Sequence, residues 1–387
     1  MRGLLVCPIS ADHPGNRGIL NKMGYQRAAL AELAGAMDVA CSSVRGPLFG
    51  NKRFADYPLA LRVFIPLNHY VLFYRYVWKH CRPFEYDFLY IRYPLAIPSF
   101  LRFLRDTKKA NPNTKIIVEV PTFPYRQEFR SPKQRVLLAL DDLGHGRLKD
   151  YVDVIVTFFG QSEIFGIPCI RIANGVDVDS IPLRTERPSS NGISMITVAN
   201  LARWHGMDRL LRGLAQYLQR EGARSVELNI VGEGPAADEL RALTRDLGLE
   251  DVVHFHGMRG GAALDALFAK ADVGLGSLGM HRLSLHRSSS LKVREYCARG
   301  IPFVLAGDDS DFPDGLRFVH RVAADESPLD VAAVVDFVDE LRKCCPDYAM
   351  EMRRYAQERL TWRAKLEPVV QFVRTGTFPT SEQRVVP

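Results

Sequence analysis

Residues 226–240 read Val-Glu-Leu-Asn-Ile-Val-Gly-Glu-Gly-Pro-Ala-Ala-Asp-Glu-Leu, and they decide the fold class. Apolar residues continue to Val231 as in a strand, and two glycines then open a segment with helical spacing. The third glycine of the dinucleotide-binding fingerprint is missing. The stretch is therefore typical of a strand-to-helix turn in a parallel sheet. Its glycines and its helix N-terminus could also approach an anion closely.

The same alternation extends in both directions from this turn. The pattern predicts strands at 193–199, 226–231, 252–256, 272–276 and 302–306, and helices at 206–221, 236–247, 261–270 and 290–299. Strands that alternate with helices favour parallel βαβ units, so we expect a Rossmann-like domain here.

The first half of the chain alternates in the same way. Strands are predicted at 3–7, 39–41, 88–93, 116–120 and 154–158, with a helix at 22–36. A Pro- and Ser-rich stretch at 182–192 is the predicted linker. We therefore expect an N-terminal domain at 1–181 and a C-terminal domain at 193–347. The segment 348–387, helical over 348–374, is expected to return to the first domain, and ligands are expected where strand carboxyl ends face a cleft.

Composition sets limits on the class of protein. The chain has 387 residues, 47% hydrophobic and 25% charged, which fits two folded domains and excludes a disordered or collagen-like chain. Its seven cysteines are scattered without paired spacing, which argues against a disulfide framework or a zinc site. No signal peptide or membrane-spanning run is visible. We expect a cytoplasmic protein, with peripheral association with the inner face of the plasma membrane left open.

The charge is unevenly distributed. Residues 1–180 hold 24 Lys and Arg against 16 Asp and Glu, a net charge of +8, whereas the remainder holds 27 against 28. A basic half favours an anionic partner such as membrane phospholipid, a phosphorylated acceptor or nucleic acid. A solubilising surface is the alternative interpretation. Nucleic acid is the poorest of these options, because no motif that reads bases accompanies the charge.

A second candidate anion site begins at Ser288-Ser-Ser-Leu-Lys-Val-Arg-Glu. The serines are typical of a helix N-cap, and Gly300 is expected to end the helix. Lys292 lies in the first turn and Glu295 three residues further along, on nearly the same face. An anion there would meet N–H groups and an ammonium, while the carboxylate could accept hydrogen bonds from a ribose diol. A capped surface helix with a Lys/Glu pair is the alternative.

The loop after strand 193–199 concentrates polar groups before the next helix. Asn200, Arg203, Trp204 and His205 lie within six residues of one another. Arginine can form two parallel hydrogen bonds with phosphate oxygens, so Arg203 is a candidate ligand of an anion. A buried tryptophan beside a solvated arginine and histidine would explain the same residues.

Together these loops resemble the second domain of retaining glycosyltransferases of the GT-B type, family 4. The similarity covers residues 174–312, and it rests on the set and order of its motifs. These are Asn174-Gly-Val-Asp, the strand and basic loop at 198–206, Val231-Gly-Glu-Gly-Pro, Phe255-His-Gly, and Leu291-Lys-Val-Arg-Glu-Tyr-Cys-Ala-Arg-Gly-Ile-Pro-Phe-Val. Trp204-His-Gly-Met-Asp-Arg and Glu119-Val-Pro-Thr-Phe-Pro-Tyr resemble a branch that acts in bacterial surface-polysaccharide and exopolysaccharide biosynthesis. The resemblance implies an α/β protein of the GT-B class, with two Rossmann-like domains facing across a cleft.

The resemblance also implies site residues, with departures. Asn200 and His205 match the family's Arg and Lys that hold the donor diphosphate, so those charges are absent and Arg203 or Lys292 could compensate. Glu295 matches the ribose ligand of the family's Glu-x7-Glu motif. Arg287 replaces its first glutamate, which leaves the donor sugar open.

The first domain carries fewer matches. The stretch from Gly15 to Gly18 resembles the family's glycine loop, which approaches donor phosphate and acceptor. Glu119 ends a strand where the family often places polar groups, although a histidine usual near that place is missing. The predicted catalytic residues are Arg203, Lys292 and Glu119. Donor ligands are predicted at Gly18, Asn200, His205, Gly232, Gly234, Met258, Ser290, Leu291 and Glu295; donor-sugar contacts at His281, Arg282 and Arg287; acceptor contacts at Asn16, Arg17 and Thr122.

We expect neither a metal nor another cofactor. Asp177-Val-Asp179 imitates the metal-binding motif of the other glycosyltransferase fold, but it follows Asn-Gly-Val at the domain join and is more typical of a structural turn. His254 and His256 alternate on one strand, and no third ligand is evident.

The functional hypothesis is transfer of a sugar from a nucleoside diphosphate sugar to a lipid-linked or growing polysaccharide acceptor. In the family, retention is attributed to front-side attack, in which the leaving phosphate accepts the acceptor proton, so no enzymic nucleophile is required. A GT-B epimerase or phosphorylase is one alternative. A catalytically degenerate sugar-nucleotide-binding or scaffolding subunit is another, because Asn200, His205 and Arg287 replace familiar charges.

Overall fold

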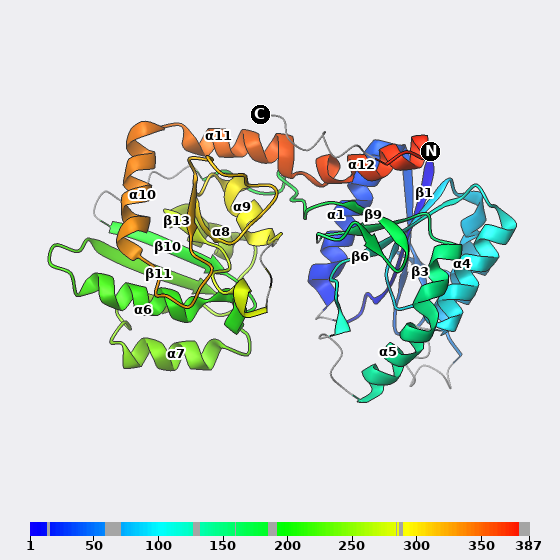
Figure 1. Ribbon diagram of the computed structural model, residues 1–387, viewed down its shortest axis with the longest axis horizontal. Helices are drawn as coiled ribbons and strands as arrows, with labels where there is room; N and C mark the ends of the chain where they lie inside the picture. The colour runs from blue at the N-terminus through cyan, green and yellow to red at the C-terminus, as the bar shows by residue number, and fades with distance from the viewer. Residues whose placement is uncertain are drawn as a thin grey trace. The chain divides into compact units, whose positions relative to one another are not determined.

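The computed structural model describes residues 1–13, 16–58, 71–126, 132–158, 160–184, 192–283, 285 and 289–378. Two compact units make up the chain (Figure 1). The first combines Met1–Ile172 with Trp362–Pro387, and the second is Ala173–Thr361. Each unit has its own sheet and its own core, and each is described separately.

The first unit is built on a sheet of nine described strands, in the order β4-β3-β2-β1-β5-β6-β7-β9-β8. The six strands from β2 to β9 in this order are parallel, while β3, β4 and β8 pair antiparallel at the two edges. The strands are β1 (Arg2–Ser10), β2 (Ala36–Ser42), β3 (Leu48–Phe49), β4 (Lys52–Arg53), β5 (Phe88–Arg92), β6 (Lys115–Val120), β7 (Val154–Thr157), β8 (Glu163–Ile164) and β9 (Ile167–Arg171).

Helices cover both faces of this sheet. Leu4 and Val6 of β1 belong to the core on one face, and Leu5 and Cys7 belong to the core on the other, as the period of a strand requires. The first face is covered by α3 (Phe73–Cys81), α4 (Pro98–Ala110) and α5 (Pro132–Gly144), with short helices η4 (Pro83–Glu85) and η6 (His145–Asp150). The second is covered by α1 (Arg17–Ala34) and α12 (Trp362–Thr375), and Figure 1 shows α12 in red beside α1 in blue.

The second unit has a wholly parallel sheet of six described strands, in the order β12-β11-β10-β13-β14-β15. Parallel strands end at one common edge, so the loops that follow them lie close together. The strands are β10 (Gly192–Val198), β11 (Ser225–Val231), β12 (Val253–Phe255), β13 (Val273–Leu275), β14 (Phe303–Ala306) and β15 (Val319–Val322).

Two helical layers enclose this second sheet. The core on one face contains side chains of α6 (Met207–Leu218), α7 (Ala237–Asp246) and α10 (Val331–Cys344). The core on the other contains side chains of α8 (Ala262–Lys270), α9 (Leu291–Arg299) and α11 (Tyr348–Tyr355). Short helices η7 (Arg203–His205) and η8 (Met280–Leu283) lie in the loops after β10 and β13.

Two predicted helices have different limits in the structure. The helix predicted at 22–36 is α1, which begins earlier, at Arg17, and ends at Ala34. Gly35 (φ +110°) ends it, and β2 begins at Ala36. The segment 348–374 is not one helix. α11 continues into a π-helical turn, η9 (Ala356–Leu360), and α12 begins only after Thr361, which is extended and pairs with Val176. Of the predicted linker at 182–192, residues 185–191 lie outside the described part of the chain.

No helix among the described residues is both long enough and apolar enough to span a membrane.

Candidate functional site

Lys292 is buried in the first turn of α9, at the carboxyl edge of the second sheet. Its residue is 9% exposed, and Nζ lies 3.4 Å from Oγ1 of Thr197, near the end of β10. No carboxylate among the described residues pairs with it. Burial lowers the pKa of Lys292 to about 7, because nothing compensates the cost of a desolvated ammonium. Lys292, Thr197 and His205 are called the Lys292 site below.

His205 is neutral at pH 7. Burial is the main cause that lowers its pKa to about 4, and the charge of Lys292 adds to the effect. The backbone N–H of Ala202 donates to Nδ1 at 3.1 Å. The proton of the neutral ring is therefore on Nε2, which makes His205 a hydrogen-bond donor rather than a second cation.

The N-terminus of α9 lacks the predicted serine cap. Ser290 precedes the helix in an extended conformation, and its side chain makes no capping hydrogen bond. Ser289 instead holds the loop at Asn174, whose backbone N–H donates to its Oγ at 2.7 Å. Leu291, at the first helical position, is 49% exposed. The positive end of the helix dipole is thus next to Lys292 with no side-chain cap.

Arg294, on the same helix, is the opposite kind of buried cation. Its side chain is fully buried and pairs with Asp309 at 2.7 Å and Asp311 at 2.5 Å. It also donates to the carbonyls of Asn174 at 2.7 Å and Ser290 at 2.9 Å. Its charge therefore holds three segments of the unit together: the loop after β14, the segment at Asn174 and the residue before α9. The sequence analysis did not predict this role. The position of Arg294 beside the apolar Val293, on a helix expected to face the core, was a signal that its charge is buried and paired.

Glu295 is half-buried and accepts from Arg299, one turn along α9, at 2.8 Å. Arg299 also pairs with Asp265 of α8 at 2.7 Å. The alternative interpretation, a surface Lys/Glu pair, is therefore wrong, because Lys292 is buried while the carboxylate of Glu295 turns toward Arg299. Of its two oxygens, only Oε1 accepts from Arg299.

The glycines after β11 are explained by packing within the chain. A Cβ on Gly232 (φ +124°) would lie 1.9 Å from the carbonyl oxygen of Ala199, and one on Gly234 would lie 2.4 Å from that of Leu201. The two loops are joined by hydrogen bonds, such as Leu201 N–H to the Glu233 carbonyl at 2.8 Å. The glycines therefore let the loops after β10 and β11 lie together, and Asn200 is exposed on that pair of loops.

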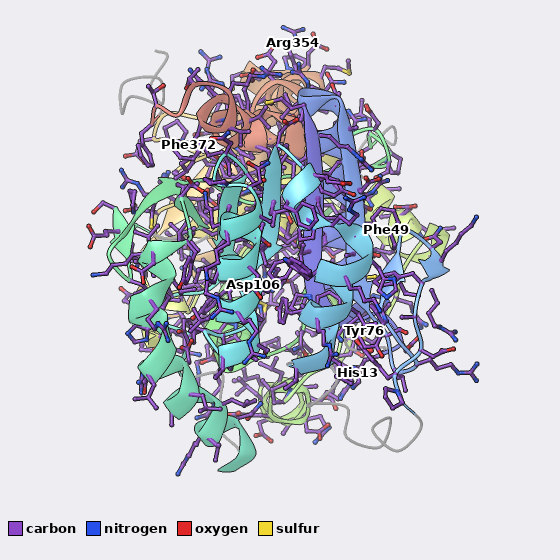
Figure 2. The ribbon with its side chains drawn as sticks, turned by 90° about the vertical axis from the view of Figure 1, so that its right-hand side faces the viewer. His13, Phe49, Tyr76, Asp106, Arg354 and Phe372 are labelled. Carbon is purple, nitrogen blue, oxygen red and sulfur yellow. The ribbon has the colours of Figure 1, made fainter. Side chains whose placement is uncertain are left out.

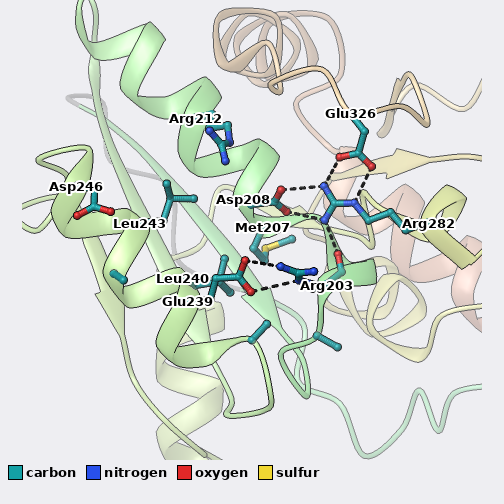
Figure 3. A pocket seen from close by; sticks show the side chains of 13 residues that line it. Arg203, Met207, Asp208, Arg212, Glu239, Leu240, Leu243, Asp246, Arg282 and Glu326 are labelled. Atoms are coloured by element: carbon teal, nitrogen blue, oxygen red, sulfur yellow. Dashed lines mark hydrogen bonds and ion pairs between the residues drawn. The ribbon is translucent and has the colours of Figure 1, made fainter.

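Arg203 belongs to a separate group of charges, which we call the arginine cluster: Arg203, Asp208, Glu239, Arg282 and Glu326. Figure 3 shows Arg203 paired with Glu239, and Arg282 held between Asp208 and Glu326. The cluster lines a pocket of about 550 Å³ beside α6 and α7, with Met207 and Leu240 among its apolar residues. Every cation of the cluster has a carboxylate partner.

The structure brings together some predicted residues and separates others. His205 lies near Lys292, but Arg203 points into the arginine cluster with its side chain 76% exposed. Arg282 and His281, the predicted sugar contacts, both bind Glu326, and Arg282 also donates to the Arg203 carbonyl at 2.7 Å. These contacts support the loop after β13. Thr197, which the sequence analysis did not select, carries no signal there because threonine is ordinary in a strand.

Glu119 forms a buried charge network in the first unit. It is fully buried on β6, and its carboxylate lies 3.3 Å from Nζ of Lys22 and 3.1 Å from Arg92. Tyr90 and Gln26 donate to its other oxygen, each at 2.6 Å. Burial opposes ionisation, but these partners together lower the pKa of Glu119. A catalytic group must touch substrate, and Glu119 has no exposed surface in this structure.

The remaining predicted residues are placed as follows. Asn16 donates from Nδ2 to the Ser10 carbonyl at 2.9 Å, which holds the start of α1 near the end of β1. Gly18 is exposed, Thr122 is half-buried, and Met258, after β12, is 74% exposed. The side chain of Arg17 and the whole of Arg287 lie outside what the structure describes.

Asp141, Asp142 and His145 form a group whose ligand atoms are close enough to share a metal ion. Asp141 already accepts hydrogen bonds from the hydroxyls of Tyr93 and Tyr125 and from the backbone of Ala96. Asp142 pairs with Arg126. These carboxylates have protein donors, so we assign no metal to them.

Comparisons with known proteins relate residues 192–335 to a family and the whole chain to a fold. Residues 192–335 match the family described as glycosyl transferases group 1. By structure, the chain is similar to HepE from Anabaena, solved in complex with UDP, at 16% identity and a TM-score of 0.59, covering 97% of this chain and 100% of that one. It is also similar to sucrose-phosphate synthase from Thermosynechococcus elongatus, at 14% identity and a TM-score of 0.61, covering 97% and 98%.

A glycosyltransferase from Rickettsia africae is similar at 13% identity and a TM-score of 0.61, covering 96% of this chain and 98% of that one. No curated protein matches the sequence. The fold class is GT-B, as predicted, and residues 192–335 match the model of the glycosyl transferases group 1 family. The Lys292 site and the whole arginine cluster lie within these matched residues.

Proposed function

We propose that the protein transfers a sugar from a nucleoside diphosphate sugar to the hydroxyl of an acceptor, with retention at the anomeric carbon. The observation that carries the proposal is Lys292. A buried ammonium with no carboxylate partner in the described residues destabilises the fold, and such groups gather at sites where a ligand supplies the missing charge. Its position beside an uncapped helix N-terminus favours a phosphate.

The balance of the reaction explains what the site must do. The bond between the anomeric carbon and the β-phosphate oxygen breaks, and the acceptor oxygen forms the new bond on the same face. The acceptor proton passes to the leaving diphosphate. Negative charge grows on that diphosphate, so a fixed ammonium and the N–H groups of α9 would lower the barrier.

The other residues receive matching roles in this proposal. His205 donates from Nε2 to a phosphate oxygen, because its Nδ1 accepts from Ala202. Glu295 binds the ribose hydroxyls through the oxygen that Arg299 does not use. Arg203 is left out, because Glu239 already neutralises it. For the acceptor we propose a lipid-linked or growing polysaccharide, supported by the basic first half of the chain and by its resemblance to surface-polysaccharide enzymes.

Calorimetric binding of UDP tests the donor site directly. We expect wild-type protein to bind UDP and Lys292→Met to lose about a hundredfold or more in affinity, which is the scale on which one preorganised charge acts. Lys270→Met is the matched control, because Lys270 is an exposed lysine at the end of α8 in the same unit. Equal affinity of all three proteins would contradict the proposal.

A donor-binding subunit without turnover is the second candidate. It is favoured by the loss of cationic character at Asn200 and His205 and by the neutralised Arg203. UDP-sugar binding with no glycoside formed on any lipid-linked or oligosaccharide acceptor would support it. Release of UDP that depends on acceptor would support the transferase.

A further inference from the structure

Helix α5 has a second apolar face that the described residues of its own unit do not cover. Leu138, Asp141 and Gly144 form the inner face, and a Cβ on Gly144 would lie 1.9 Å from the Ala96 carbonyl. The outward residues, however, are Val136, Ala139, Leu140 and Leu143, at spacings of three and four. Val136 is 63% exposed, Leu140 38% and Leu143 81%. An amphipathic helix normally buries such a stripe.

Cations flank this stripe. Leu140 and Leu143 line a groove of about 350 Å³ between α4, α5 and η6, together with Arg102, Arg105 and Arg147. Arg105 pairs with its neighbour Asp106, but Arg102 and Arg147 have no ion-pair partner in the described part of the chain. Figure 2 shows α4, marked by Asp106, with α5 beside it on this side of the first unit.

We propose that this face, formed by Val136, Ala139, Leu140, Leu143, Arg102 and Arg147, docks on a bilayer that contains anionic phospholipid. Leu140 and Leu143 enter the boundary between lipid headgroups and acyl chains, and Arg102 and Arg147 contact lipid phosphates. The proposal goes beyond the transfer reaction and does not depend on it. Exposed apolar side chains, beside arginines with no ion-pair partner among the residues that the structure describes, match the acyl chains and phosphates of an anionic membrane surface.

The size of the stripe decides between a membrane and a protein. Stable protein interfaces use about 20 to 30 residues on each side, whereas the apolar part here is four side chains on one helix. Such a narrow stripe suits an interfacial helix, which lies in the plane of the membrane and buries only its outer edge. The excess positive charge of residues 1–180 also favours binding to an anionic membrane.

Sedimentation of the full-length protein with vesicles tests the proposal. We expect binding to vesicles of phosphatidylcholine with phosphatidylglycerol and weak binding to phosphatidylcholine alone. Leu140→Ser/Leu143→Ser should reduce the partition coefficient by at least about tenfold, because two exposed apolar side chains are lost. Arg102→Gln/Arg147→Gln should reduce it by about tenfold or more and remove most of its salt dependence.

Matched controls lie in the second unit. Met350→Ser removes an apolar side chain that is 54% exposed, and Arg245→Gln removes an exposed arginine near the end of α7. Both should bind vesicles as wild type does. Since every substituted side chain is exposed, thermal unfolding should change little and would reveal a variant that fails to fold.

Three results would overturn the proposal. They are no binding of wild type to anionic vesicles, equal binding of wild type and both α5-face variants, and a dimer in solution that Leu140→Ser/Leu143→Ser dissociates without changing vesicle binding. The last result would assign the face to a second copy of the chain. The vesicle assay contains no nucleotide, so its failure leaves the proposal for Lys292 unaffected.

Discussion

Lys22 in the first unit and Lys292 in the second are both withdrawn from water, but they are compensated differently. Lys22 lies 3.3 Å from Glu119 and 3.7 Å from the ring centre of Phe158. Lys292 has a hydroxyl at 3.4 Å and no carboxylate partner among the described residues. Burial lowers both pKa values, and Glu119 offsets part of the effect at Lys22. A compensated buried charge holds a fold together, whereas an uncompensated one indicates a missing ligand.

The largest expected effect comes from removing the compensated lysine. Lys22→Met leaves Glu119 buried with one cation fewer, and we expect the free energy of unfolding to fall by about 3 to 5 kcal/mol. Urea denaturation followed by circular dichroism measures this, with Lys79→Met, an exposed lysine of α3, as control. Lys22→Met/Glu119→Gln should recover part of the loss. If Lys22→Met were as stable as wild type, the pairing with Glu119 would contribute nothing to stability, and the difference between Lys22 and Lys292 would disappear.

Removing the uncompensated lysine should do the reverse. Lys292→Met deletes a charge that burial disfavours, so we expect unliganded protein to gain roughly 4 kcal/mol of stability near pH 7, at about 1.4 kcal/mol for each unit by which the pKa is lowered. The same denaturation experiment measures it. A loss of stability would mean that Lys292 is a structural residue with a partner that compensates it.

The pH dependence of stability sharpens this point. The pKa of Lys292 is about 7 in the folded protein, whereas 10.5 is the ordinary value of a solvated lysine, so the unfolded chain binds more protons between these values. Its contribution to stability therefore rises as the pH increases from about 7 to 10.5. Wild type and Lys292→Met should converge across that window. A constant difference between them would contradict the assignment.

Binding of UDP should have the opposite pH dependence. A bound diphosphate favours the ammonium form of Lys292, so binding above pH 7 must take up a proton. We expect affinity to fall as the pH rises above 7, approaching about tenfold per unit. Calorimetry in buffers of different ionisation enthalpy measures the proton uptake directly. Lys292→Met should show none, and uptake that persists in the variant would assign the proton to another group.

A smaller effect is expected at Glu295. Glu295→Ala should raise the donor Michaelis constant by about tenfold, the scale of a hydrogen bond to a charged group. Glu340→Ala, an exposed glutamate of α10, is the control. If the constant is unchanged, Glu295 serves only to pair with Arg299.

The smallest effect is expected at Arg203. Its charge is exposed and already paired with Glu239, so Arg203→Ala should change UDP affinity by less than about twofold. Titration calorimetry under the conditions used for Lys292→Met provides the comparison. A large loss would show that the pair with Glu239 opens when donor binds, and Arg203 would then join the Lys292 site.

Most of the second unit could be read from the sequence because its signals are local. Each predicted strand there contains or overlaps an observed one, and Gly300 ends α9 in the left-handed conformation as expected. The helix limits were wrong where a long-range contact decides them. Thr361 breaks the predicted helix at 348–374 because it pairs with Val176, far away in the chain.

The sequence by itself determined the βαβ alternation and the selection of Lys292, because apolar periodicity and loop motifs depend on neighbours in the chain. The GT-B class followed from the resemblance that those loop motifs carry. Only the tertiary structure decided which charges are compensated. Arg203 and Lys292 were equivalent candidates in the sequence, but Glu239, 36 residues away, neutralises the first, while the second is buried beside Thr197. Lys22 and Glu119 likewise meet only in the folded unit. The free energy of a charge depends on its burial and its partners, and both are set by packing between distant segments.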